Sequence, residues 1–286
     1  MNRISKLTGH TLWPRLFVSI MLGVFLLHGL MGGDAQPVFV PPSIVLQAEA
    51  ATVVPTEADA PATRLLELAQ TDHIALLEWA ILRYEQHVQD YQVIFEKQER
   101  INNELKPAQK INVKVKEEPY SVLMNWQSKG GPIDKLLYVE GQNDNMMLVH
   151  PSGLLGFIKS VKKDPTSEQV RRSSRGTPDQ FGFYRCMQSL LKVYRQAHEE
   201  GDLETAYLGK TEVDGRVCLA VERFLPAGKK YPCARLILEI DEKYIVPTRL
   251  SMYDWQDNLL SIYVYKDIKF NIGIDDLIFT PQANNL

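Results

Sequence analysis

The fold is decided by the stretch from Thr205 to Phe270, which reads TAYLGKTEVDGRVCLAVERFLPAGKKYPCARLILEIDEKYIVPTRLSMYDWQDNLLSIYVYKDIKF. It contains runs of strand-forming residues, and each run is bounded by turn-forming residues. Asp214-Gly215, between the first two runs, is a strong signal for a two-residue β-hairpin. We therefore predict consecutive antiparallel strands at residues 205–213, 217–225, 233–241, 245–253 and 259–270.

Further strands are predicted upstream of this stretch. Ile111, Val113 and Val115 alternate with polar residues, which is typical of a strand with one buried face. Short runs separated by Gly, Pro or Asn punctuation indicate an antiparallel meander. The upstream strands are predicted at residues 91–100, 110–117, 121–127, 135–140 and 145–150.

Two segments have helical periodicity instead. Apolar residues recur at helical spacing from Thr63 to about Val88, with a break expected at Thr71-Asp72, and again from Asp179 to Glu200. A sheet of about ten strands must curl, and an amphipathic helix can cover its concave face. The predicted fold is therefore α+β, with a long curved antiparallel sheet that forms an open half-barrel of about ten strands and amphipathic helices packed on the concave face.

The N-terminal 35 residues have the features of an export signal. Basic residues precede an apolar run from Leu16 to Met31, which is shorter than the about 20 residues that a membrane-spanning helix needs. We predict a signal peptide at residues 1–35, and an uncleaved anchor is the alternative. Residues 36–62 are predicted to be a flexible Pro/Ala-rich linker, and residues 63–286 the folded domain. The expected location is the periplasm or the cell envelope.

Composition argues against several functions. Removing residues 1–35 would change the formal charge from −3 to −5, because three cations and one anion are lost, and an acidic protein is a poor nucleic-acid binder. Cys218 and Cys233 lie on one predicted hairpin, but Cys218 is expected opposite roughly Glu239 and out of disulfide reach of Cys233. The sequence has no Cys/His pattern for zinc and no nucleophile elbow. We predict no catalytic residues, no metal, no cofactor and no enzymatic activity.

Two groups of residues are candidates for binding. Large, soft apolar side chains on the strands would suit an irregular apolar ligand, although ordinary core packing is the alternative. These ligand-cavity candidates are Met124, Trp126, Tyr138, Met147, Phe157, Met252, Trp255 and Tyr263. The second group lies in the basic stretch 159–178, which would contact anionic lipid headgroups or an acidic partner, or would simply be a solvated loop. Its candidates are Lys162, Lys163, Arg171 and Arg172.

Several segments resemble the LolA/LolB type of lipoprotein-carrier fold. Tyr91–Arg100 resembles the first strand of that fold, and Glu118–Trp126 (EPYSVLMNW) resembles its second-strand segment. Ile245–Thr248 and Asp276–Pro281 resemble its last strands. Carriers of this type place an arginine before the proline of the second strand, where it helps to hold the lid closed, but this chain has Glu118 there. The resemblance implies a scaffold that binds lipophiles and does not by itself imply lipoprotein transfer.

Three short motifs are similar to an uncharacterised family of exported bacterial proteins, a domain of unknown function in which the same fold is suspected. They are Phe95–Arg100, Lys116–Pro119 and Leu137–Gly141.

The leading hypothesis is a non-enzymatic envelope protein that holds a lipid-like or other hydrophobic ligand between the sheet and the helices. The alternative is a structural or protein-interaction module with a filled core, which a cavity below about 300 Å³ would favour. An unrecognised hydrolase ranks last. The expected partners are a lipid or acyl chain, an envelope protein and a membrane surface contacted peripherally, but not nucleic acid.

Overall fold

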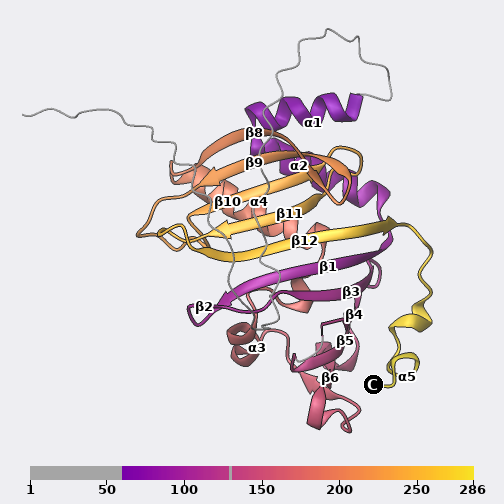
Figure 1. Cartoon of the computed structure of the whole chain (residues 1–286). Helices are drawn as coiled ribbons and strands as arrows, with labels where there is room; N and C mark the ends of the chain where they lie inside the picture. The colour runs from indigo at the N-terminus through magenta and orange to yellow at the C-terminus, as the bar shows by residue number, and fades with distance from the viewer. Residues whose placement is uncertain (1–59, 129–130) are drawn as a thin grey trace, which may run out of the picture. The chain divides into compact units, whose positions relative to one another are not determined.

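The computed structural model describes residues 60–128 and 131–286, and one antiparallel sheet dominates it (Figure 1). The 12-stranded sheet has the order β7-β6-β5-β4-β3-β1-β12-β11-β10-β9-β8, with β2 paired to β1 beside this path. The strands are β1 (Asp90–Ile101), β2 (Glu104–Leu105), β3 (Gln109–Lys116), β4 (Ser121–Trp126), β5 (Ile133–Val139), β6 (Met147–Pro151), β7 (Val161–Lys163), β8 (Glu204–Val213), β9 (Arg216–Phe224), β10 (Arg235–Asp241), β11 (Pro247–Tyr253) and β12 (Leu259–Phe270). The edges β7 and β8 are not paired with each other among the described strands, so the sheet is an open half-barrel, as predicted.

All ten predicted strands are present, each within about two residues of its expected bounds. The structure adds β2 and β7, which are two and three residues long. Strands this short have too few residues to show alternation, which explains why the sequence did not predict them. The pairing of β1 with β12 joins the two meanders into one sheet.

The helices confirm the predicted segments and add smaller ones. The elements are α1 (Ala60–Thr71), α2 (His73–His87), α3 (Glu168–Ser173), α4 (Phe183–Glu199) and α5 (Pro281–Asn284), with 3-10 turns η1 (Asn143–Asn145), η2 (Gly153–Leu155), η3 (Pro178–Gln180) and η4 (Asp276–Phe279). The predicted break falls at Asp72, whose carboxylate accepts hydrogen bonds from the backbone N–H groups of Ile74 and Ala75 at 3.0 and 2.9 Å. Asp72 therefore ends one helix and caps the next.

The predicted start of α4 at Asp179 is wrong by four residues, because the helix begins at Phe183. Gly182, the residue before it, has φ = +104°, a conformation that breaks any helix and that side chains other than glycine rarely adopt. Gly182 also lies against the sheet, since a Cβ built there would be 2.5 Å from Oη of Tyr91. The chain can thus approach β1 this closely at the start of α4 because glycine has no side chain.

Gly182→Ala is therefore expected to lower the free energy of unfolding by about 2–5 kcal/mol, from the strained backbone and the contact with Tyr91 combined. Chemical denaturation would measure the loss. Gly201→Ala is the matched control, because Gly201 has φ = +70° but open space where its Cβ would be. Adding Tyr91→Phe to Gly182→Ala should recover part of the loss, and an equal loss for both glycine variants would contradict the close approach.

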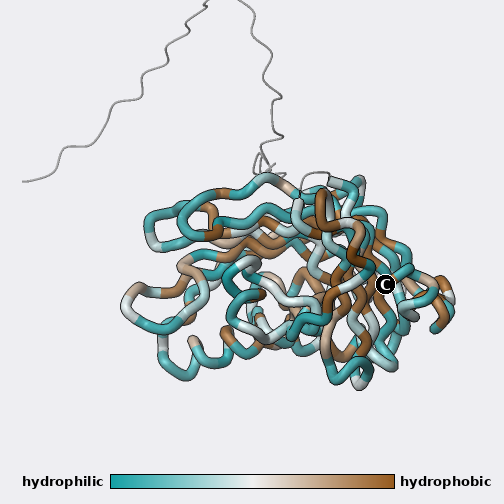
Figure 2. The backbone as a smooth tube through the Cα atoms, turned by 90° about the horizontal axis from the view of Figure 1, so that it is seen from below, coloured by the Kyte–Doolittle hydropathy of each residue, from teal (hydrophilic) through white to brown (hydrophobic). Residues whose placement is uncertain are grey.

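Helices α2 and α4 lie on one face of the sheet, behind β9 to β11 in Figure 1, and form the main hydrophobic core with it. Figure 2, a view from below, shows the hydrophobic residues gathered toward the interior and the hydrophilic ones on the outer loops. A smaller core lies on the opposite face of β4 to β6, where Leu123, Leu137 and Leu148 pack against Ile274 and Phe279 of the C-terminal segment. The sheet is thus covered by helices on its concave side and by the chain terminus on part of the other.

The expectation that Asp276–Pro281 forms a last strand is wrong. These residues form η4 and the first residue of α5. The reason is local capping, because the Asp275 carboxylate accepts a hydrogen bond from Leu277 N at 2.9 Å and the Thr280 hydroxyl accepts one from Ala283 N at 3.3 Å.

The predicted signal peptide and nearly all of the predicted linker lie outside the described residues. Helix α1 begins at Ala60, so the described structure includes the end of the segment predicted to be linker. Within residues 60–128 and 131–286, no helix is long and apolar enough to span a membrane.

Candidate functional site

Six of the eight ligand-cavity candidates belong to the apolar face that the helices cover. Met124, Tyr138 and Met147 are buried in the main core, on the half of the sheet formed by β4 to β6. Trp126 packs against that core from β4, and Met252 and Tyr263 pack against it from β11 and β12. The structure therefore places these six residues on one continuous face.

The other two candidates lie away from that face. Phe157 follows η2 and is 82% exposed. Trp255 lies in the turn between β11 and β12, where its indole Nε1–H donates to the carbonyl oxygen of Leu225 at 3.2 Å. The structure does not bring either side chain together with the six residues under the helices.

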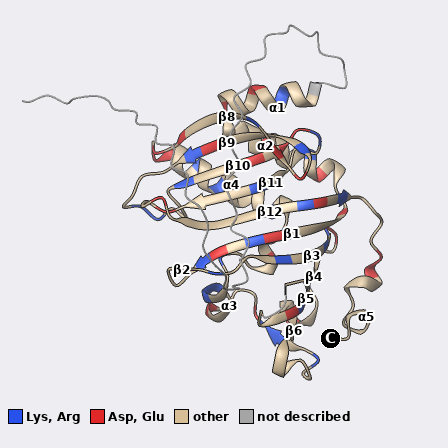
Figure 3. Cartoon of the chain, viewed as in Figure 1, with Lys and Arg blue, Asp and Glu red and all other residues tan. Residues whose placement is uncertain are grey.

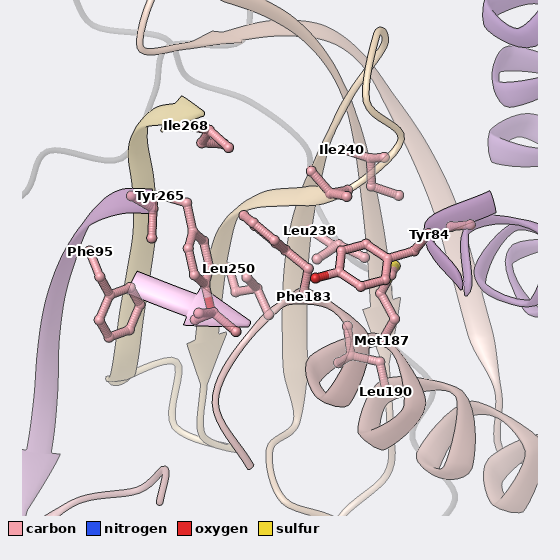
Figure 4. Close-up of a cluster of buried hydrophobic side chains, with 14 of the residues drawn as sticks. Tyr84, Phe95, Phe183, Met187, Leu190, Leu238, Ile240, Leu250, Tyr265 and Ile268 are labelled. Atoms are coloured by element: carbon pink, nitrogen blue, oxygen red, sulfur yellow. The ribbon is translucent and has the colours of Figure 1, made fainter. Parts of the chain in front are cut away.

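Side chains of α4 fill the space over the face. Phe183 is completely buried, and its ring centroid lies 4.7 Å from that of Tyr265 and 4.9 Å from that of Tyr91 (Figure 4). Met187, one turn further along α4, is also completely buried. The space between α4 and this part of the sheet is therefore filled by side chains of the protein.

Neither of two recesses at the described surface is lined by the ligand-cavity candidates. The larger, of about 640 Å³, is an open groove along α4 lined by Ile81, Gln188, Leu191, Lys192, Arg195, Gln196 and Glu199. The smaller, of about 40 Å³, lies beside Lys97 and Glu99 and is far below the about 300 Å³ of a typical small-ligand site.

A buried arginine that was not among the predicted site residues lies at one end of the helix-covered face. Arg223 of β9 is only 1% exposed, and its Nη2 donates to Sγ of Cys233 at 3.2 Å. Its guanidinium carbon lies 5.0 Å from the ring centroid of Tyr194 in α4. Within the described structure, Nε and Nη1 of Arg223 and the Tyr194 hydroxyl have no hydrogen-bond partner. The Arg223 guanidinium and the Tyr194 hydroxyl are thus buried at α4 with hydrogen-bond donors that have no acceptor in the described structure.

The register of the sheet places further polar groups in line with Arg223. Arg223 pairs with Leu236, Leu236 with Met252, Met252 with Ser261 and Ser261 with Glu99, each on the next strand. The buried Ser261 hydroxyl also has no partner among the described residues. One row across the sheet therefore combines a cation, apolar side chains, a hydroxyl and a carboxylate.

Glu99, at the end of that row, is buried but well bonded. Its carboxylate accepts hydrogen bonds from Oη of Tyr263 at 2.6 Å, from Nζ of Lys97 at 3.0 Å and from Oγ of Ser174 at 3.0 Å. Burial acts to raise the pKa of Glu99, but the Lys97 charge and these hydrogen bonds outweigh it and hold the pKa below its usual range. Glu99 is therefore ionised at neutral pH and fastens the segment after α3 to the sheet.

A second polar cluster joins α2 and α4 to the turn between β3 and β4. Glu117 accepts a hydrogen bond from Oη of Tyr84 at 2.6 Å and an ion-pair contact from Nη1 of Arg185 at 3.3 Å. The Arg185 guanidinium lies over the Tyr120 ring, 3.2 Å from its centroid. Burial, only partly offset by Tyr84 and Arg185, raises the pKa of Glu117. Glu117 thus ties helices α2 and α4 to the sheet.

The four basic candidates lie on two neighbouring elements. Lys162 and Lys163 belong to β7, and Arg171 and Arg172 belong to α3, where Figure 3 shows positive residues. Lys163 Nζ donates to Oε1 of Gln169 in α3 at 3.0 Å. Lys162 contacts Asp144 at 3.4 Å, and Arg172 forms an ion pair with Glu168. The basic stretch, for which a solvated loop was one interpretation, therefore contains a strand and a helix, which carry these side chains.

The cysteines are free thiols in the structure. Cys218 pairs with Asp241 across the hairpin, two residues from the predicted position, so it remains far from Cys233. No group of three His, Cys, Asp or Glu residues in the described ranges is arranged to hold a metal ion.

Residues 88–286 match the family described as "Protein of unknown function (DUF1571)". The chain belongs to this family. The match begins at the end of α2 and includes every strand, so the DUF1571 region carries the whole sheet, α4 and the C-terminal cover. The prediction of an uncharacterised family is confirmed. No protein with a curated description matches this DUF1571 chain.

Solved structures similar to this DUF1571 protein share little sequence with it. A DUF1329 family protein from Desulfovibrio piger is 14% identical with a TM-score of 0.38, over 73% of this chain and 98% of that one. A putative outer membrane lipoprotein-sorting protein domain from Vibrio parahaemolyticus is 12% identical with a TM-score of 0.36, over 73% and 98%. The MucA/MucB complex of Pseudomonas aeruginosa is 11% identical with a TM-score of 0.43, over 73% and 62%.

Proposed function

We propose that this DUF1571 protein is a non-enzymatic component of the cell envelope that binds an amphiphile between the sheet and helices α2 and α4. The amphiphile would have an apolar chain and an anionic headgroup. The observation that supports this proposal is Arg223, a buried cation whose Nε and Nη1 have no partner in the described structure.

Leaving buried donors unpaired is costly. Each unsatisfied buried polar group costs about 1–3 kcal/mol, and charged groups cost more. A carboxylate or phosphate would accept charge-assisted hydrogen bonds from Nε and Nη1 of Arg223, while the Tyr194 hydroxyl would supply a further donor. The apolar chain would follow the face that begins with Leu236 and Met252, next to Arg223 in the sheet register. Bound in this way, the ligand would satisfy groups that have no hydrogen-bond partner in the described structure.

Ligand entry would require α4 to move away from the sheet, because Phe183 and Met187 fill the space beneath it. Near its N-terminus, α4 is held by Arg185, which contacts Glu117. Near its C-terminus, α4 is held as well, because the buried Ala197 packs against Leu225 and Tyr231. We infer that the contacts at both ends of α4 would have to loosen for a ligand to enter.

The experiment compares binding of cis-parinaric acid, a fluorescent fatty acid, with binding of its uncharged methyl ester. We expect Arg223→Met to weaken binding of the acid by at least about tenfold and to leave binding of the ester unchanged. The same substitution should stabilise the ligand-free protein by about 1–4 kcal/mol, because it removes a buried, unpaired charge. The matched control is Arg235→Met, since Arg235 is paired with Glu222 and Asp257. Equal binding of the acid by Arg223→Met and the parent protein would overturn the headgroup assignment.

The tight packing of α4 supports a second candidate, a structural or protein-interaction module with a filled core. In that case neither probe would bind, and solvent extraction of the purified protein followed by mass spectrometry would recover no lipid. For either candidate we propose export, as the N-terminal 35 residues suggest, and contact of Lys162, Lys163, Arg171 and Arg172 with an anionic surface.

A further inference from the structure

The turn after β6 exposes three large apolar side chains within four residues. Leu154 is 97% exposed, Phe157 82% and Leu155 55%. A single exposed leucine is ordinary, but a group of large apolar side chains that project from one turn marks a contact surface. We call residues 153–158 the apolar tip.

The apolar tip is folded. Gly156 N donates to the carbonyl oxygen of Gly153 at 3.0 Å, and Ile158 N donates to that of Leu155 at 2.9 Å. The turn is also bound to the neighbouring connection, because Ser152 N donates to the carbonyl oxygen of Pro132 at 3.1 Å. The hydrogen-bonded backbone of this turn thus holds Leu154 and Phe157 exposed to solvent. Apolar side chains normally stabilise a fold by being buried, and these two are not.

A basic stretch follows the apolar tip in the sequence. Lys159 comes directly after the tip, and Lys162 lies on β7, the next strand, where it also contacts Asp144 at 3.4 Å; both lysines are exposed. Residues 159–175 contain six Lys or Arg and only two Asp or Glu, whereas the whole chain has a formal charge of −3. The exposed apolar group is therefore followed directly by a strongly basic stretch of an otherwise acidic protein.

We propose that the apolar tip inserts into an anionic lipid bilayer, with Leu154, Leu155 and Phe157 below the headgroups and Lys159 and Lys162 beside the phosphates. Two signals together, buried apolar area and attraction to anionic lipid, give stable peripheral binding. A protein partner would offer a groove or a flat face to this surface. A bilayer fits a short turn with adjacent lysines better, because its acyl chains would contact the apolar side chains and its phosphates would contact the lysines. The inference does not depend on the ligand proposed for the concave face.

The test places a tryptophan at the apolar tip of the full chain and measures its quenching by vesicles of brominated phosphatidylglycerol. Phe157→Trp is compared with Leu277→Trp, because Leu277 is also exposed, at 68%, but lies in η4. The parent protein, which has four tryptophans, supplies the background to subtract. We expect the added tryptophan at 157 to be quenched at least about threefold more than that at 277. The comparison is between positions, so any membrane affinity of residues 1–35 affects both variants alike.

Charge reversal and a second position complete the test. Adding Lys159→Glu and Lys162→Glu to Phe157→Trp should reduce quenching in phosphatidylglycerol vesicles that also contain phosphatidylcholine, and the loss should be larger at low salt. Leu154→Trp repeats the measurement at the most exposed of the three side chains, where a larger residue does not disturb packing. If tryptophans at 154 and 157 are quenched no more than the one at 277, the insertion proposal is wrong, and a protein partner becomes the better explanation of the tip.

Discussion

Replacing Phe183 with alanine is expected to lower the free energy of unfolding by about 3–5 kcal/mol, the range for a completely buried phenylalanine. Phe183 begins α4, and its ring packs against those of Tyr91, Tyr265 and Phe270 from the two strands that join the halves of the sheet. Alanine would leave a void between helix and sheet that the surrounding rings cannot fill. Urea denaturation of both proteins would measure the difference.

Phe224→Ala is the matched control for Phe183→Ala. Phe224 ends β9 and is 41% exposed, so its truncation removes little buried area and should change stability by less than about 1 kcal/mol. Equal losses for the two variants would mean that α4 is not seated on the sheet as the structure has it.

The strands of the sheet were predictable because their signals are local. Asp214-Gly215 is an example, since both residues have positive φ, +53° and +72°, and join Val213 of β8 to Arg216 of β9. The hairpin of β9 and β10 was also predicted, but Cys218 lies opposite Asp241 instead of Glu239. This error of two residues preserves the face on which each side chain lies, because side chains alternate with a period of two.

The start of α4, helix α3 and the placement of Phe157 were not predicted by the same means. Phe157 was grouped with the ligand-cavity candidates because of its residue type, which does not reveal whether a turn points inward or outward. Helix α3 lies in a stretch so rich in charge that no apolar period is visible. Gly182, just before α4, lies against Tyr91, and Ser174, just after α3, is bonded to Glu99, so both elements depend on contacts between segments that are distant in sequence.

Arg223 was missed although the sequence contains a signal for it. Leu219, Val221 and Arg223 occupy alternate positions of β9, and Leu225 continues this phase just beyond the strand, so the arginine lies in the inward phase of an otherwise apolar strand. Glu99 occupies the equivalent phase of β1, after Phe95 and Lys97. The charges were visible as exceptions to the pattern, but their surroundings were not, because Tyr194 and Ser174 come from distant parts of the chain.

An ion pair on the other face of the sheet behaves in the opposite way to Arg223. Glu239 of β10 is 1% exposed and lies directly opposite Arg249 of β11, whose Nη1 is 3.0 Å from its Oε2. Arg249→Met would leave this buried carboxylate without its cation and is expected to cost about 3–5 kcal/mol of stability at neutral pH. Methionine at 223 should therefore stabilise the protein, and methionine at 249 should destabilise it.

The pH dependence of Arg249→Met identifies the buried carboxylate as the cause. Burial raises the pKa of Glu239, and the Arg249 charge only partly offsets this effect, so the folded protein binds the proton more tightly than the unfolded chain does. Stability therefore falls as the pH rises from the unfolded pKa through the folded one. Without Arg249 the folded pKa is higher still, so the cost of Arg249→Met should be smallest in acid, where Glu239 is protonated, and should grow toward neutral pH. Denaturation across this range would measure the cost of Arg249→Met at each pH.

Two controls accompany this measurement. Adding Glu239→Gln to Arg249→Met should restore most of the stability and remove the pH dependence of the cost. Lys269→Met, at an exposed pair with Asp267, should have no measurable effect at any pH. A cost that stays constant with pH would mean that Arg249 acts through its packing and not through its charge.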